Sequence, residues 1–305
     1  MENSGKLAAE QARTALNGRR ERAQRRVKHD AEPLWLWPNL LSLDAPLVAA
    51  AWELLIAREY KIPAPEATTL VLALAVWVIY VGDRVFDALR LKTTEGLAAR
   101  HRFYREHWRA FLLPVAVAGF AGGWLAVTQL DAAVFLNGVI LLAAIGAYFG
   151  FVHLLPRRQW FPKELAVGVV FAAGCFLPAW RGAALPGLDL MLPALLFAGV
   201  CWVNLGIIEH TEWSRLRDRQ WDAPHPWSVW LGRHAVAASA AAVLLALLFM
   251  PLAVSGARML LAAVALGAAG LAALGACTDK LSVDAVRVWA DVGLLAPLLL
   301  LPLAR

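Results

Sequence analysis

The sequence predicts an all-α, polytopic integral membrane protein with about nine transmembrane helices, and three observations lead to this prediction. Hydrophobic residues make up 60% of the 305-residue chain, and charged residues make up only 17%. The mean hydropathy is +0.57. Soluble domains carry about a quarter charged residues. The charges are also confined to a few segments, which separate apolar runs long enough to cross a bilayer.

The apolar runs define the predicted spans in chain order. The first 39 residues form a separate basic tail, and residues 40–305 form the transmembrane domain. The polar turn "PRRQWFPKE" separates the fourth span from the fifth. The seventh and eighth spans are rich in Ala and Gly, which lets helices approach closely in lipid. The predicted spans are residues 40–57, 67–82, 110–128, 132–152, 164–180, 190–208, 235–255, 258–277 and 288–304.

The basic residues predict the orientation of the chain. If the amino terminus is cytoplasmic, 24 of the 29 Lys and Arg residues lie in inner segments. This asymmetry follows the positive-inside rule, so we expect a cytoplasmic amino terminus in a membrane of the bacterial inner-membrane type. The net charge of +6 is explained by this topology and by acidic lipid, so nucleic acid is not an expected partner. The first 30 residues contain no apolar core of a signal peptide.

Paired carboxylates follow two of the predicted spans on the inner side. Asp83 and Asp87 are four residues apart after the second span, so they share one helix face. Glu209 and Glu212 are three residues apart after the sixth span, and Asp218 follows in the same loop. Carboxylates this close repel one another unless a cation such as Mg²⁺ compensates them. Spacing alone leaves two interpretations open: a magnesium site that holds a diphosphate, or helix-end salt bridges with Arg84, Arg90 and Arg215.

The stretch "YVGDRVFD" at 80–87 resembles the first signature, NDxxDxxxD, of the UbiA-type membrane prenyltransferase superfamily. Asp83 and Asp87 match its second and third aspartates, whereas Ile79 and Tyr80 stand where the family has Asn and the first Asp. Three further stretches are similar to family segments: "SLDAPLVAAAWELLIA", "PKELAVGVVFAAG" and "HPWSVWLGRH". The second signature departs further, because "EHTE" has Glu in place of Asp, and the usual Arg-Pro after the first signature is missing. The resemblance covers residues 40–304.

The resemblance implies an activity and an architecture. The activity is Mg²⁺-dependent transfer of a prenyl group from an isoprenoid diphosphate to a lipophilic acceptor within the membrane. The architecture is a helical bundle around a cytoplasm-facing cavity. In the family, the metal and basic residues hold the diphosphate and stabilise the charge that builds as it leaves. Carried onto this chain, the catalytic and metal-binding residues are Asp83, Asp87, Glu209 and Glu212, and the substrate-binding residues are Arg84, Lys92, Lys163, Tyr80 and Asp218.

The missing first aspartate leaves a second function open. In this alternative, the protein is a catalytically degenerate UbiA-like protein that binds lipid or acts as an assembly scaffold. A secondary transporter would be expected to show broken helices or repeats, and the sequence has no convincing repeat. Glu53 and Asp291 are ionisable residues inside predicted spans, where such residues are expected to be functional. We assign neither a catalytic role.

Overall fold

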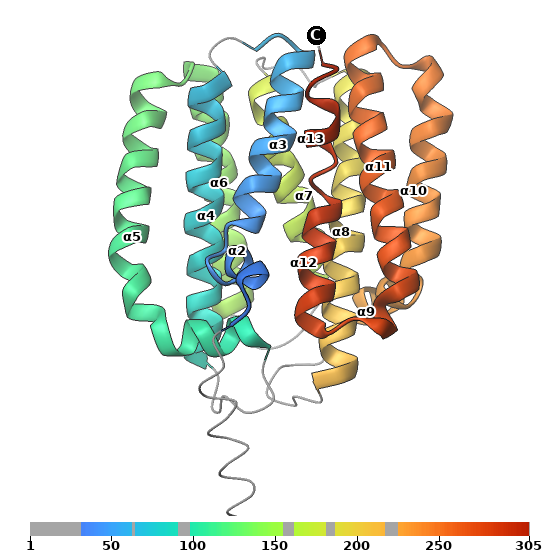
Figure 1. Ribbon diagram of the computed structural model, residues 1–305. Helices are drawn as coiled ribbons and strands as arrows, with labels where there is room; N and C mark the ends of the chain where they lie inside the picture. Colours follow the sequence, from blue (N-terminus) through green and yellow to red (C-terminus); the bar gives the residue numbers. More distant parts are fainter. Residues whose placement is uncertain are drawn as a thin grey trace, which may run out of the picture. The chain divides into compact units, whose positions relative to one another are not determined.

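The computed structural model describes residues 32–62, 65–90, 98–154, 162–180, 187–216 and 225–304. These residues form helices and contain no strand. The chain from Pro38 onward is one compact unit, a bundle of helices, and the residues up to Trp37 belong to a second unit (Figure 1).

A helix overlaps each of the nine predicted spans. The α-helices are α2 (Trp37–Leu40), α3 (Asp44–Glu59), α4 (Pro65–Arg90), α5 (Ala99–Gln129), α6 (Ala132–Leu154), α7 (Lys163–Phe176), α8 (Leu188–Leu216), α9 (Pro226–Arg233), α10 (Ala235–Phe249), α11 (Ser255–Cys277), α12 (Val283–Gly293) and α13 (Pro297–Leu300). Short 3-10 helices are η1 (Leu34–Leu36), η2 (Leu177–Ala179), η3 (Met250–Leu252) and η4 (Thr278–Lys280).

Among the described residues, five helical segments are long and apolar enough to cross a membrane. A sixth is added if Leu34–Leu40 and Asp44–Glu59 are counted together as one span. The all-helical fold and these apolar helices are compatible with an integral membrane protein. The five segments are Glu66–Leu89, Ala99–Gln129, Leu188–Arg215, Ala235–Leu252 and Gly256–Lys280.

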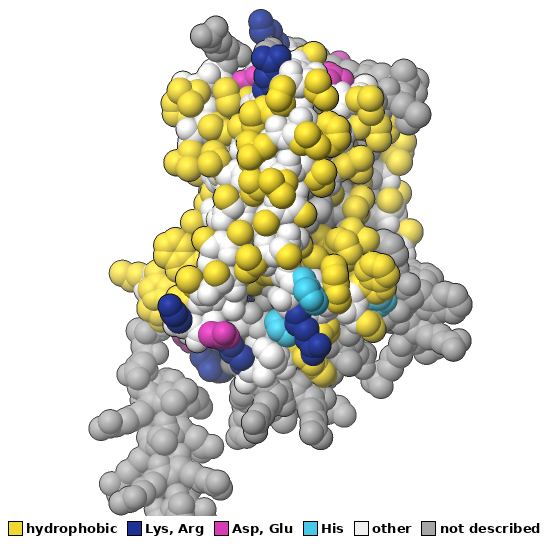
Figure 2. Space-filling view, turned by 90° about the vertical axis from the view of Figure 1, so that its right-hand side faces the viewer, with side chains coloured by type: hydrophobic (Ala, Val, Ile, Leu, Met, Phe, Trp, Pro, Cys, Tyr) yellow, Lys and Arg dark blue, Asp and Glu magenta, His cyan; other side chains and the backbone are white. Residues whose placement is uncertain are grey.

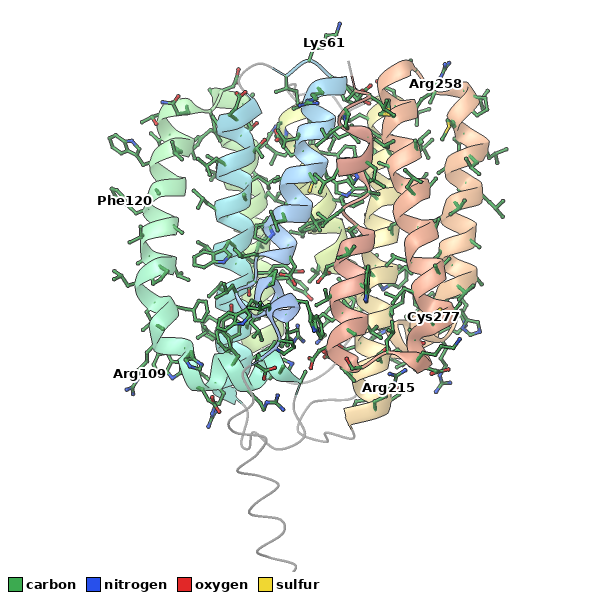
Figure 3. All side chains as sticks on the ribbon, in the orientation of Figure 1. Lys61, Arg109, Phe120, Arg215, Arg258 and Cys277 are labelled. Carbon is green, nitrogen blue, oxygen red and sulfur yellow. The ribbon has the colours of Figure 1, made fainter. Side chains whose placement is uncertain are left out.

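Charged and apolar side chains separate along the length of the bundle. On the face formed by α10 and α11, apolar side chains cover the middle and charged side chains lie toward the two ends (Figure 2). Lys61 and Arg258, predicted on the outer side, lie at one end of the bundle (Figure 3). Arg109 and Arg215, predicted on the inner side, lie at the opposite end, and Phe120 projects outward between the two ends. This arrangement agrees with the two sets of loops expected from the sequence.

Helix α3 packs at the centre of the bundle, against α4, α7, α11, α12 and α13. Its Trp52 is fully buried, stacks on Phe197 of α8 with ring centroids 3.7 Å apart, and donates its indole N–H to the Leu294 carbonyl at 2.9 Å. Bilayer lipid is as apolar as these side chains, so close packing and interhelical hydrogen bonds of this kind hold such helices together. They set the position of α3 relative to α8 and α12.

The intramembrane acid Glu53 is compensated by hydroxyl groups of the next helix. Its side chain is fully buried in α3. Thr68 of α4 donates to Glu53 Oε1 at 2.6 Å, and Thr69 of α4 donates to Glu53 Oε2. Buried polar groups cost free energy unless they are hydrogen-bonded, so these two bonds account for the acid at this position and join α3 to α4.

Candidate functional site

Asp83 and Asp87 lie near the carboxyl end of α4, and both are partly exposed. Their four-residue spacing places them on one face of the helix, as the sequence predicts. Helix α4 is long because the apolar run from Ala67 to Tyr80 continues to Asp83 without Pro, and Gly82 does not end the helix. The aspartates therefore extend from the last turns of a candidate membrane-spanning segment.

Arg84 lies between the two aspartates in sequence and is directed toward α3. Its side chain is buried, and it donates to the Asn39 carbonyl at 2.5 Å and to Asp44 Oδ2 at 3.4 Å. Its guanidinium carbon lies 5.5 Å from the centroid of the Tyr80 ring, which is within the range of a cation–π contact. Arg84 thus joins the start of α3 to α4 in this structure.

Glu212, near the carboxyl end of α8, pairs with two arginines from other helices. Its Oε1 lies 2.5 Å from Arg287 of α12, and its Oε2 lies 3.4 Å from Arg100 of α5. The three side chains keep only 15%, 8% and 17% exposure, respectively. Both carboxylate oxygens therefore accept guanidinium groups, and the cluster connects α5, α8 and α12.

Arg215, the partner that the salt-bridge interpretation assigns to the α8 glutamates, bonds elsewhere. It donates to the carbonyls of Leu281 and Thr278, each at 2.7 Å, and lies 3.4 Å from Asp279. These groups belong to the segment that follows α11. A cationic side chain stabilises free carbonyls at the end of a helix, so Arg215 joins α8 to the end of α11.

Lys163, the first residue of α7, lies beside Glu164, and charges of α4 and α8 also act on it. Its side chain is 55% exposed, and its Nζ lies 4.0 Å from Glu164 Oε1. The charge of Glu209 on α8 is the main cause that raises the pKa of Lys163, and Glu164, Asp87 and Asp83 act in the same direction. An opposite charge raises a lysine pKa only when it is close. Acids of α4 and α8 therefore act on one lysine.

The carboxylates fit a magnesium ion only in part. Across the described ranges, no three His, Cys, Asp or Glu side chains are close enough together to bind a metal ion. Mg²⁺ commonly takes only one or two protein carboxylates, and water and phosphate oxygens complete its shell. The pair Asp83 and Asp87 meets this lower requirement. Glu212 contributes less readily, because both of its oxygens are paired with arginines.

Two predicted substrate-binding residues, Lys92 and Asp218, lie outside the described residues. Sequence reasoning did not single out Asp44, Arg100 or Arg287, which form the buried ion pairs. Asp44 lies within "SLDAPLV", a stretch already similar to the family's first span, so that similarity was a signal for it. Arg100 and Arg287 have no comparable signal, because each resembles an ordinary basic residue of an inner loop.

Comparison of the chain with protein family models, with curated proteins and with solved structures found no match.

Proposed function

We propose that the protein is a UbiA-like membrane prenyltransferase. It transfers a prenyl group from an isoprenoid diphosphate to a lipophilic acceptor in the membrane, and it requires Mg²⁺. The observation that carries this proposal is the pair of partly exposed acids, Asp83 and Asp87, on one face of α4, together with the exposed Lys163, whose pKa is raised by acids of α8 and α4. These acids lie on the two helices that correspond to the motif-bearing helices of the family.

The charges around Lys163 suit a divalent cation together with an anionic ligand. Among the described groups that act on Lys163, Glu209, Glu164, Asp87 and Asp83 are all acids, so these residues together carry excess negative charge. Asp83 and Asp87 would hold the metal. When bound, Mg²⁺ would neutralise the diphosphate and favour its departure. Lys163 would contact the diphosphate oxygens and stabilise the negative charge that they gain as the carbon–oxygen bond breaks.

The same proposal includes the family's architecture. We assign nine spans to the chain, a cytoplasmic amino terminus in an inner membrane, and a cavity that opens to the cytoplasm. The helix that overlaps each predicted span supports the nine-span topology. The separation of Lys61 and Arg258 from Arg109 and Arg215 supports the orientation. The diphosphate would then enter from the cytoplasmic side.

The test is binding of farnesyl diphosphate to the purified full-length protein with and without Mg²⁺. We expect Mg²⁺ to strengthen binding, and we expect Asp83→Asn and Lys163→Gln each to weaken it by about tenfold, equivalent to about 1.4 kcal/mol. Glu106→Gln is the matched control, because Glu106 is an exposed acid on α5. The proposal is wrong if Mg²⁺ does not change the affinity for farnesyl diphosphate and if Asp83→Asn and Lys163→Gln bind it as tightly as the wild type and the control do.

A second candidate is a lipid-binding protein or assembly scaffold without transferase activity. The specific observation in its favour is that Arg84 and Glu212, two predicted active-site residues, are held by buried partners within the protein. Tyr80 also stands where the family has its first aspartate. This candidate expects prenyl diphosphate or phospholipid to bind equally well without Mg²⁺, and expects no release of diphosphate over time. Measuring diphosphate release together with binding separates the two functions.

A further inference from the structure

Helix α9 packs so closely against α8 that only glycine fits at one position. A Cβ at Gly232 would lie 2.3 Å from His210 Cβ and 2.5 Å from the Gly206 carbonyl oxygen. Contacts below about 3 Å do not occur in real structures, so a side chain here would force the helices apart. Gly206 and His210 belong to the same stretch of α8 as Glu209. The position of α9 is therefore tightly coupled to this stretch.

The same helix also holds α7, through one buried hydrogen bond. Ser228 of α9 is fully buried, and its hydroxyl donates to Glu164 Oε2 of α7. Glu164 is itself 4% exposed. Its other oxygen, Oε1, is buried, accepts no hydrogen bond from the described residues, and lies 4.0 Å from Lys163 Nζ. One carboxylate oxygen is thus held by α9, and the other faces the lysine.

We propose that Ser228 is a positioning residue that acts on Lys163 through Glu164. The hydroxyl holds Glu164 in one orientation and takes up part of the hydrogen-bonding capacity of the carboxylate. The carboxylate then attracts Lys163 only weakly, because Glu164 Oε1 and Lys163 Nζ are 4.0 Å apart. More than half of the lysine side chain stays exposed and can contact a ligand. The role of this lysine in binding diphosphate rests on the proposed function, whereas the control of its charge by Ser228 does not.

Removing either group changes Lys163 in a defined direction. In Ser228→Ala, the buried carboxylate keeps Lys163 as its main partner, so the ion pair tightens and the amine becomes harder to deprotonate. In Glu164→Gln, a negative neighbour that raises the pKa of Lys163 is lost, so the amine deprotonates at lower pH. The two substitutions therefore have opposite effects, which a general loss of structure would not produce.

The experiment measures acylation of Lys163 by an amine-reactive ester in the full-length protein, resolved by mass spectrometry over a range of pH. Only the neutral amine reacts. We expect Ser228→Ala to slow acylation of Lys163 about threefold and to move the midpoint of its pH profile up. We expect Glu164→Gln to speed acylation about threefold and to move the midpoint down. Ser214→Ala is the control, because this exposed serine of α8 bonds only to the Thr211 carbonyl in the described structure. We expect no change in this variant.

Affinity for inorganic diphosphate and for farnesyl diphosphate is measured on the same samples. We expect Ser228→Ala to weaken both about threefold, because the tighter ion pair draws the ammonium away from the ligand. Unchanged acylation rates and pH midpoints in both variants would overturn the inference. If the wild type binds no diphosphate while acylation still shifts, the proposed function fails and the positioning role stands. If Ser228→Ala does not fold, the acylation rate of Lys163 in Glu164→Gln tests the inference, because this substitution preserves the shape of the side chain.

Discussion

Single residues decide which charges remain available to a ligand. Glu212 shares its two oxygens between Arg100 and Arg287, at exposures of 17% and 8% for the two arginines. Removing one partner of a buried ion pair strongly lowers the free energy of unfolding, because the remaining charge is then buried without an opposite charge beside it. Asp83 and Asp87 are partly exposed. Glu212 is therefore expected to contribute mainly to stability.

We predict that Glu212→Gln lowers the free energy of unfolding by about 3 kcal/mol, because two buried guanidinium groups then share no carboxylate. Chemical unfolding of the detergent-solubilised protein measures this change. Glu106→Gln, at an exposed position of α5, is expected to change stability by less than about 0.5 kcal/mol. A Glu212→Gln protein that is fully stable but has lost Mg²⁺-dependent diphosphate binding would place Glu212 among the metal ligands instead.

At the scale of elements, the short helix α9 has more influence than its eight residues suggest. It contacts α8 through Gly232 and α7 through Ser228. These two helices provide Glu209 and Lys163. Helix α3 has a similar role on the other side, where Asp44 holds Arg84 and Glu53 accepts from the hydroxyls of α4. Each element thus positions charged groups that belong to its neighbours.

Replacing Gly232 by Ala is predicted to destabilise the protein by about 2 kcal/mol, because the added methyl group has no room between α9 and α8. The thermal unfolding midpoint in detergent measures the effect. Gly199→Ala is the matched control within α8, where a Cβ would meet nothing within 4 Å. We expect this control to be neutral or slightly stabilising, because alanine is a better helix former than glycine. Equal midpoints for the two variants would contradict the close packing of α9.

At the scale of the whole molecule, the middle of the bundle differs from its two ends in the way expected of a protein that crosses a membrane. Apolar side chains cover the middle of the face in Figure 2, and charges lie toward its ends. Lys61 and Arg258 lie at the end opposite to Arg109, Arg215 and Cys277. This pattern suits a protein that crosses the bilayer along the length of its helices. Residues at the two ends of the bundle can also be used to test the proposed orientation directly.

Thiol labelling of membrane vesicles tests this orientation. Cys277 is exposed, whereas Cys175 and Cys201 are buried and are expected to react slowly. A membrane-impermeant maleimide is predicted to label Cys277 in inverted vesicles and not in right-side-out vesicles. In a Cys277→Ser background, Lys61→Cys is expected to show the reverse pattern. Labelling of both positions from the same side would contradict the proposed topology.

Much of the fold follows from local sequence properties. Apolar runs bounded by Pro, Gly or charged residues predict helices, and a helix overlaps every predicted range. The four-residue spacing of Asp83 and Asp87 predicts their shared face without knowledge of any other helix. The division of α7 from η2 and of α12 from α13 was not predicted. Hydropathy reports the polarity of a segment and is insensitive to a local change of helix type or to a short break.

The sequence by itself determined the helical segments and the charge asymmetry and predicted a membrane protein, because these properties depend on composition and on short periodic patterns. Only the tertiary structure decided the partners of the charges. Arg84 bonds to Asp44, and Glu212 bonds to Arg100 and Arg287. Lys163 pairs with Glu164, and the charge of Glu209 raises its pKa. An arginine in an inner loop has the same local sequence whether it faces lipid headgroups, a ligand or a buried carboxylate. The packing of distant helices makes that choice, because buried charges must find partners.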